Sequence, residues 1–313
     1  MTAERAYLAV DIGGTKLSCG VVSLDGRVLA QERCATPPAQ VWDTLSALVG
    51  RVMAGAAHLQ LIACGVGAGG PMSDNGNKVS TLSIPSWRNF ALRSSLAQLT
   101  GLATFVDNDA KAVVLGETWC GAAVGCRDVI GMVVSTGVGG GIITDGRLLD
   151  GNSGNAGHIG HICVVPNGRL CKCGARGCLE AVASGTAIAE MTGQPAADAP
   201  AHVVEQTGMY VGRAVAAVVA LLDLRLAVIG GSVALGFGEP FFRAAQTEAD
   251  RYAAIEFARG IRLMPAGLGG DAPLVGVGEQ RAGSPGGGEV VGVEGLQAVL
   301  DGQRAEQRAL LRP

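Results

Sequence analysis

Lysine is scarce in this 313-residue sequence, and basic charge is not in excess. Lys and Arg number 24 against 27 Asp and Glu, for a formal net charge of −3, and only four positions are lysine: Lys16, Lys78, Lys111 and Lys172. Nucleic-acid binders present clustered basic side chains that neutralise phosphates. The composition therefore predicts that no nucleic acid is a partner.

Long apolar runs are also missing. The longest covers residues 214–222 and is followed by Asp223, whereas about 20 residues are needed to cross a bilayer. The first residues, MTAERAYLAV, lack the charged-then-apolar order of a secretory signal. We expect a soluble, cytoplasmic protein without a membrane partner.

Glycine and cysteine, by contrast, are abundant. The 49 glycines cluster where predicted strands end. The nine cysteines are odd in number and no secretion signal accompanies them, so a local Cys cluster predicts metal or redox chemistry rather than disulfides. With 48% hydrophobic and 16% charged residues, the chain has the composition of a compact globular protein, and its length fits two domains.

The order of the predicted elements repeats along the chain. Strands at 7–10 and 17–22 flank the turn 11–16, and a strand at 129–134 is followed by the glycine-rich turn 135–141. The other predicted strands are at 28–33, 59–66, 104–106, 142–144 and 226–229, and helical periodicity marks 41–57, 92–99, 110–119, 179–191, 203–223 and 240–256. The repeat predicts two related α/β halves.

The chain divides accordingly into a small N-terminal α/β domain over residues 1–115 and a larger α/β domain over 116–281. The larger domain includes a Cys-rich loop at 161–178. A tail over 282–313 begins with AGSPGGGE, which is typical of a linker, and it contains few large apolar residues. We expect this tail to be mobile.

Three interpretations compete for the glycine loops. A Walker A loop needs Gly-Lys followed by Ser or Thr, and none of the four lysines stands in that context. The stretch 65–70 (GVGAGG) matches the dinucleotide pattern G-x-G-x-x-G, but Pro71 follows where a Rossmann unit needs a helix. The third interpretation is phosphate binding by the turns 11–16 (DIGGTK) and 135–141 (STGVGGG), whose bare backbone N–H groups can surround an anion.

Side chains in these two turns support the phosphate interpretation. The hydroxyls of Thr15 and Thr136 add donors, and Asp11 would repel a phosphate unless Mg²⁺ lay between them. Two ordinary glycine hairpins are the alternative. Their corresponding places in the two halves favour phosphate binding.

These motifs resemble those of a known family. DIGGTK, VDNDA (106–110), STGVGGG and GGS (230–232) are similar, over residues 7–276, to the motifs of the ROK family of sugar kinases and repressors. The resemblance implies the two-domain α/β fold of the actin/hexokinase-like (ribonuclease H-like) superfamily, with an interdomain cleft, and we also expect a homodimer. It implies ATP and Mg²⁺ as cofactors, bound at Asp11, Gly13, Gly14, Thr15, Lys16, Thr136, Gly137, Gly139, Gly230 and Gly231.

Asn108 and Asp109 stand between a predicted strand and a predicted helix. Either residue type fits a helix N-cap. Phosphoryl transfer to a hydroxyl, however, needs an acceptor that orients the O–H group and takes its proton. The resemblance assigns the general-base role to Asp109 and a sugar contact to Asn108.

His161, Cys171, Cys173 and Cys178 have the spacing H-x9-C-x-C-x4-C. Three thiolates and one imidazole suit tetrahedral Zn²⁺, whereas a redox motif is C-x-x-C; coincidence in a Cys-rich chain is the alternative. The ROK family carries this cluster as a zinc loop. Four protein ligands leave no open position, so the zinc is expected to be structural. Cys163 falls outside the pattern, and we expect it to be buried.

The resemblance also assigns sugar contacts to His161 and Glu180, which the zinc loop would position. Where the family has a sugar-binding Glu, this chain has His158, as in N-acetylmannosamine kinases and some actinobacterial glucokinases. The family's sugar-binding Asn before Trp87 is absent, with Ser83 nearest. We include His158 among the sugar-binding residues and leave the identity of the sugar open.

The predicted activity is ATP-dependent phosphorylation of a hexose or N-acylhexosamine, glucose or N-acetylmannosamine, at the 6-hydroxyl. A ROK-type sugar-responsive regulator and a non-catalytic sugar sensor are the alternatives. Only ten residues precede Asp11, too few for the regulators' helix-turn-helix domain, and an intact Asp109 argues against the sensor.

After residues 270–276, VGEQRAGSP (277–285) replaces the family's Ala/Leu helix that packs on the first domain. We therefore expect exposed apolar surface there.

Overall fold

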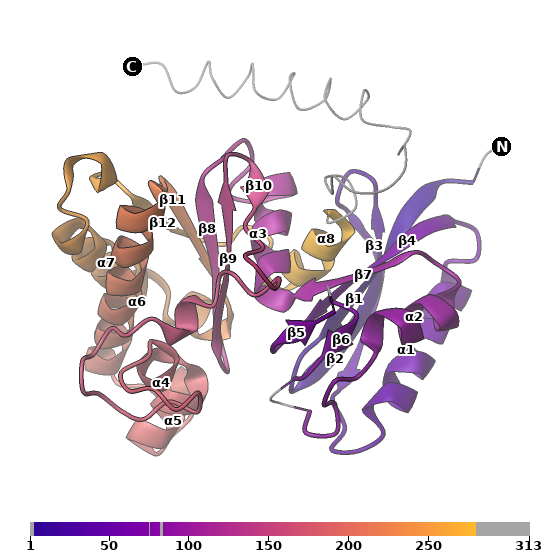
Figure 1. Cartoon of the computed structure of the whole chain (residues 1–313), viewed down its shortest axis with the longest axis horizontal. Coiled ribbons are helices and arrows are strands. Elements are labelled where there is room, and N and C mark those ends of the chain that lie inside the picture. Colours follow the sequence, from indigo (N-terminus) through magenta and orange to yellow (C-terminus); the bar gives the residue numbers. More distant parts are fainter. Residues whose placement is uncertain (1–2, 75, 82–83, 280–313) are drawn as a thin grey trace.

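Two five-stranded sheets of matching strand order form the framework of the molecule (Figure 1). The computed structural model describes residues 3–74, 76–81 and 84–279. The tail predicted over 282–313 and the position Ser83 lie outside the described residues.

In the first sheet the strands follow the order β3-β2-β1-β4-β7. β1 pairs antiparallel with β2 and parallel with β4, and therefore lies at the centre. The strands are β1 (Arg5–Ile12), β2 (Lys16–Ser23), β3 (Val28–Ala35), β4 (Gln60–Ala68) and β7 (Thr104–Asn108). Alternate residues of β1 face opposite sides: Leu8 and Val10 pack in the core with α1 (Val41–Gly55) and α2 (Leu92–Thr100), and Ala9 belongs to a cluster on the other side.

The second sheet repeats this plan in the order β10-β9-β8-β11-β12, with the same antiparallel and parallel pairs. Its strands are β8 (Val129–Val134), β9 (Val138–Thr144), β10 (Arg147–Leu148), β11 (Leu226–Gly230) and β12 (Arg262–Pro265). β9 begins before the predicted 142 because its glycines pair with β8 instead of forming a turn. A helix packs closely over them, since a Cβ on Gly141 would lie 2.7 Å from the Lys111 Cα. The common strand order supports the internal repeat.

Helices α6 (Ala201–Leu222) and α7 (Ser232–Tyr252) cover one face of the second sheet (Figure 1). Val215 of α6 and Phe241 of α7 are buried in one cluster with Met132 of β8. On the opposite face, Val129 of β8 and Val228 of β11 form a cluster with Val114 of the helix over residues 109–120. Because both faces are covered, β8 and β11 have near-continuous hydrophobic sequences.

Two helices differ from the sequence prediction. The single helix expected at 179–191 is instead α4 (Glu180–Ala183) and α5 (Gly185–Thr192), because Ser184 is extended and its side chain caps α5. The helix expected from residue 240 already begins at Ser232, with a break at Gly238. The short elements are β5 (Met72–Ser73), β6 (Lys78–Val79) and the 3₁₀ helices Ile159–His161, Ala196–Asp198, Glu256–Ala258 and Gly269–Asp271.

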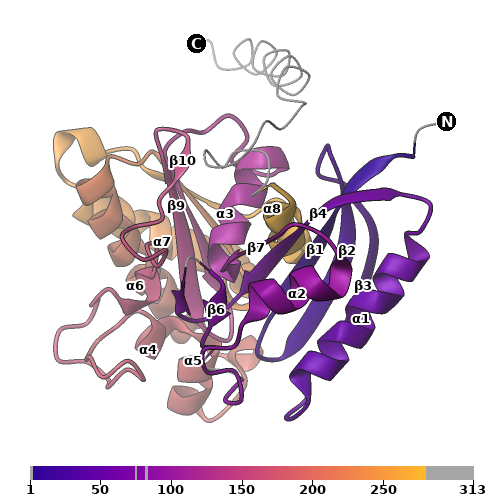
Figure 2. The same ribbon diagram turned by 45° about the vertical axis from the view of Figure 1, so that its right-hand side comes forward.

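Helices α3 (Asp109–Cys120) and α8 (Ala272–Glu279) lie side by side between the two sheets (Figures 1 and 2). α3 follows the first sheet in sequence but packs on β8 and β9 of the second, and α8 returns to β1 and β4 of the first. The two helices meet through glycines: a Cβ on Gly276 would lie 1.6 Å from the carbonyl oxygen of Ala112. The boundary expected between residues 115 and 116 falls inside α3.

A helix does return to the first half and covers apolar surface there, whereas the atypical segment 277–285 predicted exposed apolar surface; residues 280–285 of that segment lie outside the described residues. Leu274 and Val277 of α8 are 1% and 0% exposed and form a cluster with Ala9 and Val22 of the first sheet. Residues 277–279 (VGE) complete this helix. The prediction used Ala/Leu composition, whereas the close packing of α8 on the sheet depends on small residues. Gly65 of β4 shows this, because a Cβ there would lie 1.8 Å from the Val277 carbonyl oxygen.

Gly276→Ala is expected to lower the free energy of unfolding by about 2 kcal/mol or more, because the new methyl group collides with the backbone of α3. Gly270→Ala is the matched control, since a Cβ at Gly270 has no atom within 4 Å. Denaturant titration of both variants measures the difference. Equal stability of the two variants would contradict the close α3–α8 contact.

None of the helices that the structure describes is both long enough and apolar enough to cross a membrane. The longest, α6, has 22 residues and a polar side as well as a buried one.

Candidate functional site

Asp109 lies at the start of α3, where β7 ends beside β4. Its Oδ1 accepts a hydrogen bond from the Ala110 N–H at 2.9 Å, and Asn108 Oδ1 accepts one from the same N–H at 3.0 Å. Gly69, which follows β4, borders this carboxylate, since a Cβ there would be in van der Waals contact with Asp109 Oδ2 at 3.5 Å. Burial raises the pKa of Asp109 above its ordinary value, although the Ala110 N–H lowers it.

Asp11 lies near the end of β1, close enough to Asp109 for their charges to interact. The turn after β1 is closed by a hydrogen bond from the Gly13 N–H to the Lys16 carbonyl oxygen at 2.9 Å. Burial, followed by the charge of Asp109, raises the pKa of Asp11 to about 7, against the lowering effects of Lys16 and Arg33. Two carboxylates thus share one poorly solvated site, and a divalent cation would stabilise both in their ionised forms.

The second glycine loop lies against the start of α3. A Cβ on Gly139 would lie 2.8 Å from the Cβ of Ala110. Ser135 Oγ is 3.0 Å from Ser232 Oγ at the start of α7, and a Cβ on Gly231 would lie 2.3 Å from the backbone of β8. The structure therefore brings together the second glycine loop, the turn after β11 and the N-terminus of α3.

Exposed groups are present in both glycine loops. Gly14, Thr15 and Lys16 in the first loop and Thr136 in the second are exposed. The Thr136 carbonyl oxygen accepts a hydrogen bond from Thr186 Oγ1 at 2.9 Å, which holds the second loop to α5. The loops therefore combine fixed backbones with polar groups that a ligand can reach.

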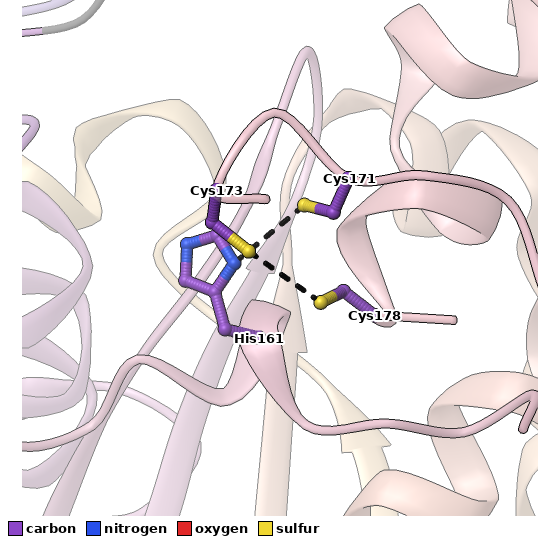
Figure 3. Close-up of side chains that lie close together, drawn as sticks. All are labelled: His161, Cys171, Cys173 and Cys178. Atoms are coloured by element: carbon purple, nitrogen blue, oxygen red, sulfur yellow. Dashed lines mark hydrogen bonds between the residues drawn. The ribbon is translucent and has the colours of Figure 1, made fainter. Parts of the chain in front are cut away.

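His161 and three cysteines form a compact cluster (Figure 3). The ligand atoms of His161, Cys171, Cys173 and Cys178 all lie within 4.8 Å of one another. Cys171 Sγ is 3.8 Å from His161 Nδ1, and Cys173 Sγ is 3.7 Å from Cys178 Sγ. Tetrahedral ligands about 2.3 Å from a common Zn²⁺ lie about 3.8 Å apart. The donor set and its spacing therefore fit a Zn²⁺ site.

Backbone turns hold the cysteine ligands in place. The Cys171 N–H donates to the Ala175 carbonyl oxygen at 2.7 Å, and the Gly174 N–H donates to the Cys171 carbonyl oxygen at 2.9 Å. Gly177 precedes the last ligand with φ of 72°, and a Cβ there would lie 1.8 Å from the Val165 carbonyl oxygen. Glycine is therefore required at this position.

In the sequence, His158 precedes this cluster and Glu180 follows it. Glu180 Oε2 accepts a hydrogen bond from the Val138 N–H at 3.2 Å, so it connects the cysteine segment to the second glycine loop. The ring centre of His158 is 6.1 Å from that of His161. Burial lowers the pKa of His158, and the charges of His161 and Lys111 lower it further, so the imidazole is neutral at pH 7.

Two buried ionisable residues of α3 were not predicted. Lys111 of α3 is 1% exposed, and its Nζ donates to Asp150 Oδ1 and to the Gly154 carbonyl oxygen, both at 2.9 Å. Glu117 is 0% exposed and accepts hydrogen bonds from three backbone N–H groups, those of Ala122, Gly267 and Leu268. A charged residue within an apolar helical stretch (AKAVVLG) was the one available signal for Lys111.

The expectation that Cys163 is buried is wrong, because its side chain is exposed. Whether a cysteine in an irregular loop is buried depends on which segments pack against the loop, and local sequence does not contain that information.

A pocket of about 360 Å³ in the described part of the chain lies between α5 and α6, where Met191, His202 and Gln206 line it. The residues that line this pocket include none of the predicted site residues.

Comparisons with known proteins agree with this arrangement. A model of the ROK family matches residues 7–278. A glucokinase of Halalkalibacterium halodurans is 32% identical over 88% of this chain and 94% of its own length. An N-acetylmannosamine kinase of Citrobacter koseri is 37% identical over 74% of this chain and 84% of its own length.

Solved structures give the same result. A ROK family glucokinase from Streptomyces griseus, in complex with glucose and AMPPNP, has a TM-score of 0.76 and 31% identity, and the match covers 88% of this chain and 98% of that one. A ROK family transcriptional regulator, homologous to the Escherichia coli MLC protein, has a TM-score of 0.76 and 26% identity, over 88% and 78% of the two chains. The chain therefore has the predicted α/β, actin/hexokinase-like fold and belongs to the ROK family.

Proposed function

We propose that this chain is an ATP-dependent sugar kinase that phosphorylates the 6-hydroxyl of a hexose or N-acylhexosamine, glucose or N-acetylmannosamine. The observation that carries the proposal is the half-buried Asp109 carboxylate, which lies near Asp11 of the first glycine loop. It is also adjacent to Ala110, which contacts Gly139 of the second loop. The similarity to a glucokinase and an N-acetylmannosamine kinase supports the same class of reaction.

Asp109 is the general base in this proposal. The sugar hydroxyl oxygen forms a bond to the γ-phosphorus of ATP, the bond to the β-phosphate oxygen breaks, ADP leaves, and the hydroxyl proton passes to the carboxylate. The raised pKa of Asp109 makes the carboxylate a better proton acceptor than an exposed aspartate. Asn108 Oδ1 already accepts the Ala110 N–H, so the Asn108 amide NH₂ is the group that would donate to a second sugar hydroxyl.

The glycine loops would hold ATP and Mg²⁺. The N–H groups of Gly14, Gly137 and Gly139, the hydroxyls of Thr15 and Thr136 and the Lys16 ammonium would contact the phosphates, with adenosine beside Gly230 and Gly231. Gly13 would line the same site, while its own N–H closes the turn on the Lys16 carbonyl oxygen. The crowded carboxylate of Asp11 fits Mg²⁺, directly or through water. When bound, the ion neutralises phosphate charge.

The sugar would lie between Asn108 and the cysteine segment. His161, Glu180 and His158 supply donors and acceptors for its hydroxyls, and Zn²⁺ bound by His161 and the three cysteines would fix the segment that carries them. Positioning of this kind contributes to catalysis because a small displacement of the reacting hydroxyl is costly.

A sugar-responsive regulator and a non-catalytic sugar sensor are the alternatives, and the similarity to a ROK regulator supports the first. Measuring ADP release with glucose, mannose, N-acetylglucosamine and N-acetylmannosamine decides between them and the kinase. We expect release that depends on sugar and Mg²⁺. If a sugar binds but no ADP is released from ATP, the chain is not an ATP-dependent kinase. The same conclusion follows if polyphosphate is the only effective phosphoryl donor.

His158→Glu is expected to shift relative kcat/KM between plain and N-acylated sugars by at least about 10-fold, in favour of the plain sugars. Neutral His158 offers one donor and one acceptor, and the donor suits an acetamido carbonyl, whereas a glutamate only accepts. The four sugars above, assayed with both forms of the protein, provide the measurement. An unchanged preference would mean that His158 packs beside the cysteine segment without contacting the sugar.

A further inference from the structure

Lys111 occupies an unusual position for a charged side chain. It lies on the first turn of α3, two residues after Asp109, and is 1% exposed. A buried ammonium group is stable only when it is paired and hydrogen-bonded. The partners of Lys111 therefore indicate its structural role.

Those partners come from two segments. Lys111 Nζ lies 2.9 Å from Asp150 Oδ1, 2.9 Å from the Gly154 carbonyl oxygen and 3.4 Å from Asp107 Oδ1. Asp107 belongs to β7 and also accepts the Asn108 N–H at 2.7 Å. One cation thus links the strand end that leads to Asp109 with the loop at 149–158.

The loop 149–158 ends at His158, and β9 holds both of its ends. The Leu149 N–H donates to the Ile142 carbonyl oxygen at 2.8 Å, and Gly157 packs closely on Gly140. The two ends of the loop are joined by a hydrogen bond from the Ala156 N–H to the Asp150 carbonyl oxygen at 3.0 Å. Asn155 reaches the first half, where its side chain accepts the Met72 N–H and donates to the Met72 carbonyl oxygen, both at 3.3 Å. Lys111 adds an ion pair to Asp150 and a hydrogen bond to the Gly154 carbonyl oxygen within the loop.

We propose that Lys111 is a positioning residue for the sugar site: by binding Asp107, Asp150 and the Gly154 carbonyl oxygen, it fixes the loop 149–158 and His158 relative to Asp109. This inference rests on the proposed function. It assigns Lys111 no contact with substrate, and it concerns the sugar side of the site and not the nucleotide side. Loss of the ammonium leaves Asp107 and Asp150 without their cation and Gly154 without its donor, so the loop detaches from α3.

Two variants test this inference. Lys111→Met keeps the length of the side chain and removes its charge. Asp150→Asn weakens the same contact from the other side, and because Asp150 is 65% exposed this variant is expected to fold even if Lys111→Met does not. Asp198→Asn, an exposed aspartate in the same half, is the matched control.

We expect the sugar KM to rise at least about 10-fold in Lys111→Met and about 3-fold in Asp150→Asn, with the ATP KM within about 2-fold of normal in both. Amide hydrogen exchange in residues 149–158 should accelerate at least about 10-fold, with β9 unchanged. Asp198→Asn should alter none of these quantities. A general structural defect would instead raise both KM values and accelerate exchange throughout the second half.

The outcomes are separable from the proposed function. An unchanged sugar KM, an equal rise of both KM values, or unchanged exchange in 149–158 would each overturn the positioning role. Absence of ADP release from the unaltered protein with all four sugars would refute the kinase, and the exchange rates would then still decide whether Lys111 anchors the loop.

Discussion

Asp109→Asn is expected to lower kcat by about 100-fold or more, which corresponds to about 2.7 kcal/mol of transition-state stabilisation, while the sugar KM stays within about 2-fold. The asparagine oxygen can still accept the Ala110 N–H, so the start of α3 keeps its hydrogen bond. What the variant loses is a proton acceptor in the transition state. Steady-state rates with saturating ATP and varied sugar measure the effect.

The pKa of Asp109 gives this prediction a second measurement. Because burial raises that pKa, kcat/KM should fall as the pH decreases through it, and this limb should disappear in the asparagine variant. Because its pKa is higher in the folded protein than in the unfolded chain, ionised Asp109 lowers the free energy of unfolding at higher pH. This loss of stability is absent below the pKa of the group in the unfolded chain. Asp109→Asn should therefore unfold at an equal or higher temperature at pH 8.

Asp43→Asn is the matched control, since Asp43 is also an aspartate in the first turn of a helix but is exposed on α1. It should leave kcat unchanged. If Asp109→Asn also turned over at a near-normal rate, Asp109 would be no more than a helix cap, a role that Asn108 already fills.

Cys173→Ser has the second largest expected effect. Metal analysis should find one Zn²⁺ per chain, and this variant should lose most of it, because a serine hydroxyl is a poor replacement for a thiolate ligand. The sugar KM should rise about 10-fold or more, since His161 and Glu180 lose their fixed positions. The unfolding temperature should fall by several degrees, because metal binding stabilises only the folded cluster.

Cys163→Ser controls for the loss of a thiol, because Cys163 is exposed in the same segment and lies outside the cluster. It should retain Zn²⁺, stability and activity. Metal-free protein with full activity and an unchanged unfolding temperature would contradict the zinc assignment.

Local spacing in the sequence was sufficient for much of the candidate site. The four ligand residues from His161 to Cys178 lie within one short segment, so their pattern alone predicted the cluster that the structure contains. The position of Asp109 between a strand and a helix followed from the sequence pattern, whereas its assignment as general base came from the resemblance to the ROK family. The strand order of the two sheets agrees with the repeated pattern of turns. These features depend on neighbours in sequence, which periodicity and turn chemistry describe well.

Tertiary structure alone decided the rest, since the relevant partners are distant in sequence. Lys111 is 39 residues from Asp150, and Glu117 is 150 residues from Gly267, so neither contact leaves a local pattern. The return of α8 to the first sheet depended on close approach at Gly65, which the sequence shows only as one of 49 glycines. A charged or small residue is recognisable in sequence, but its burial and its partners are set by segments that only folding brings together.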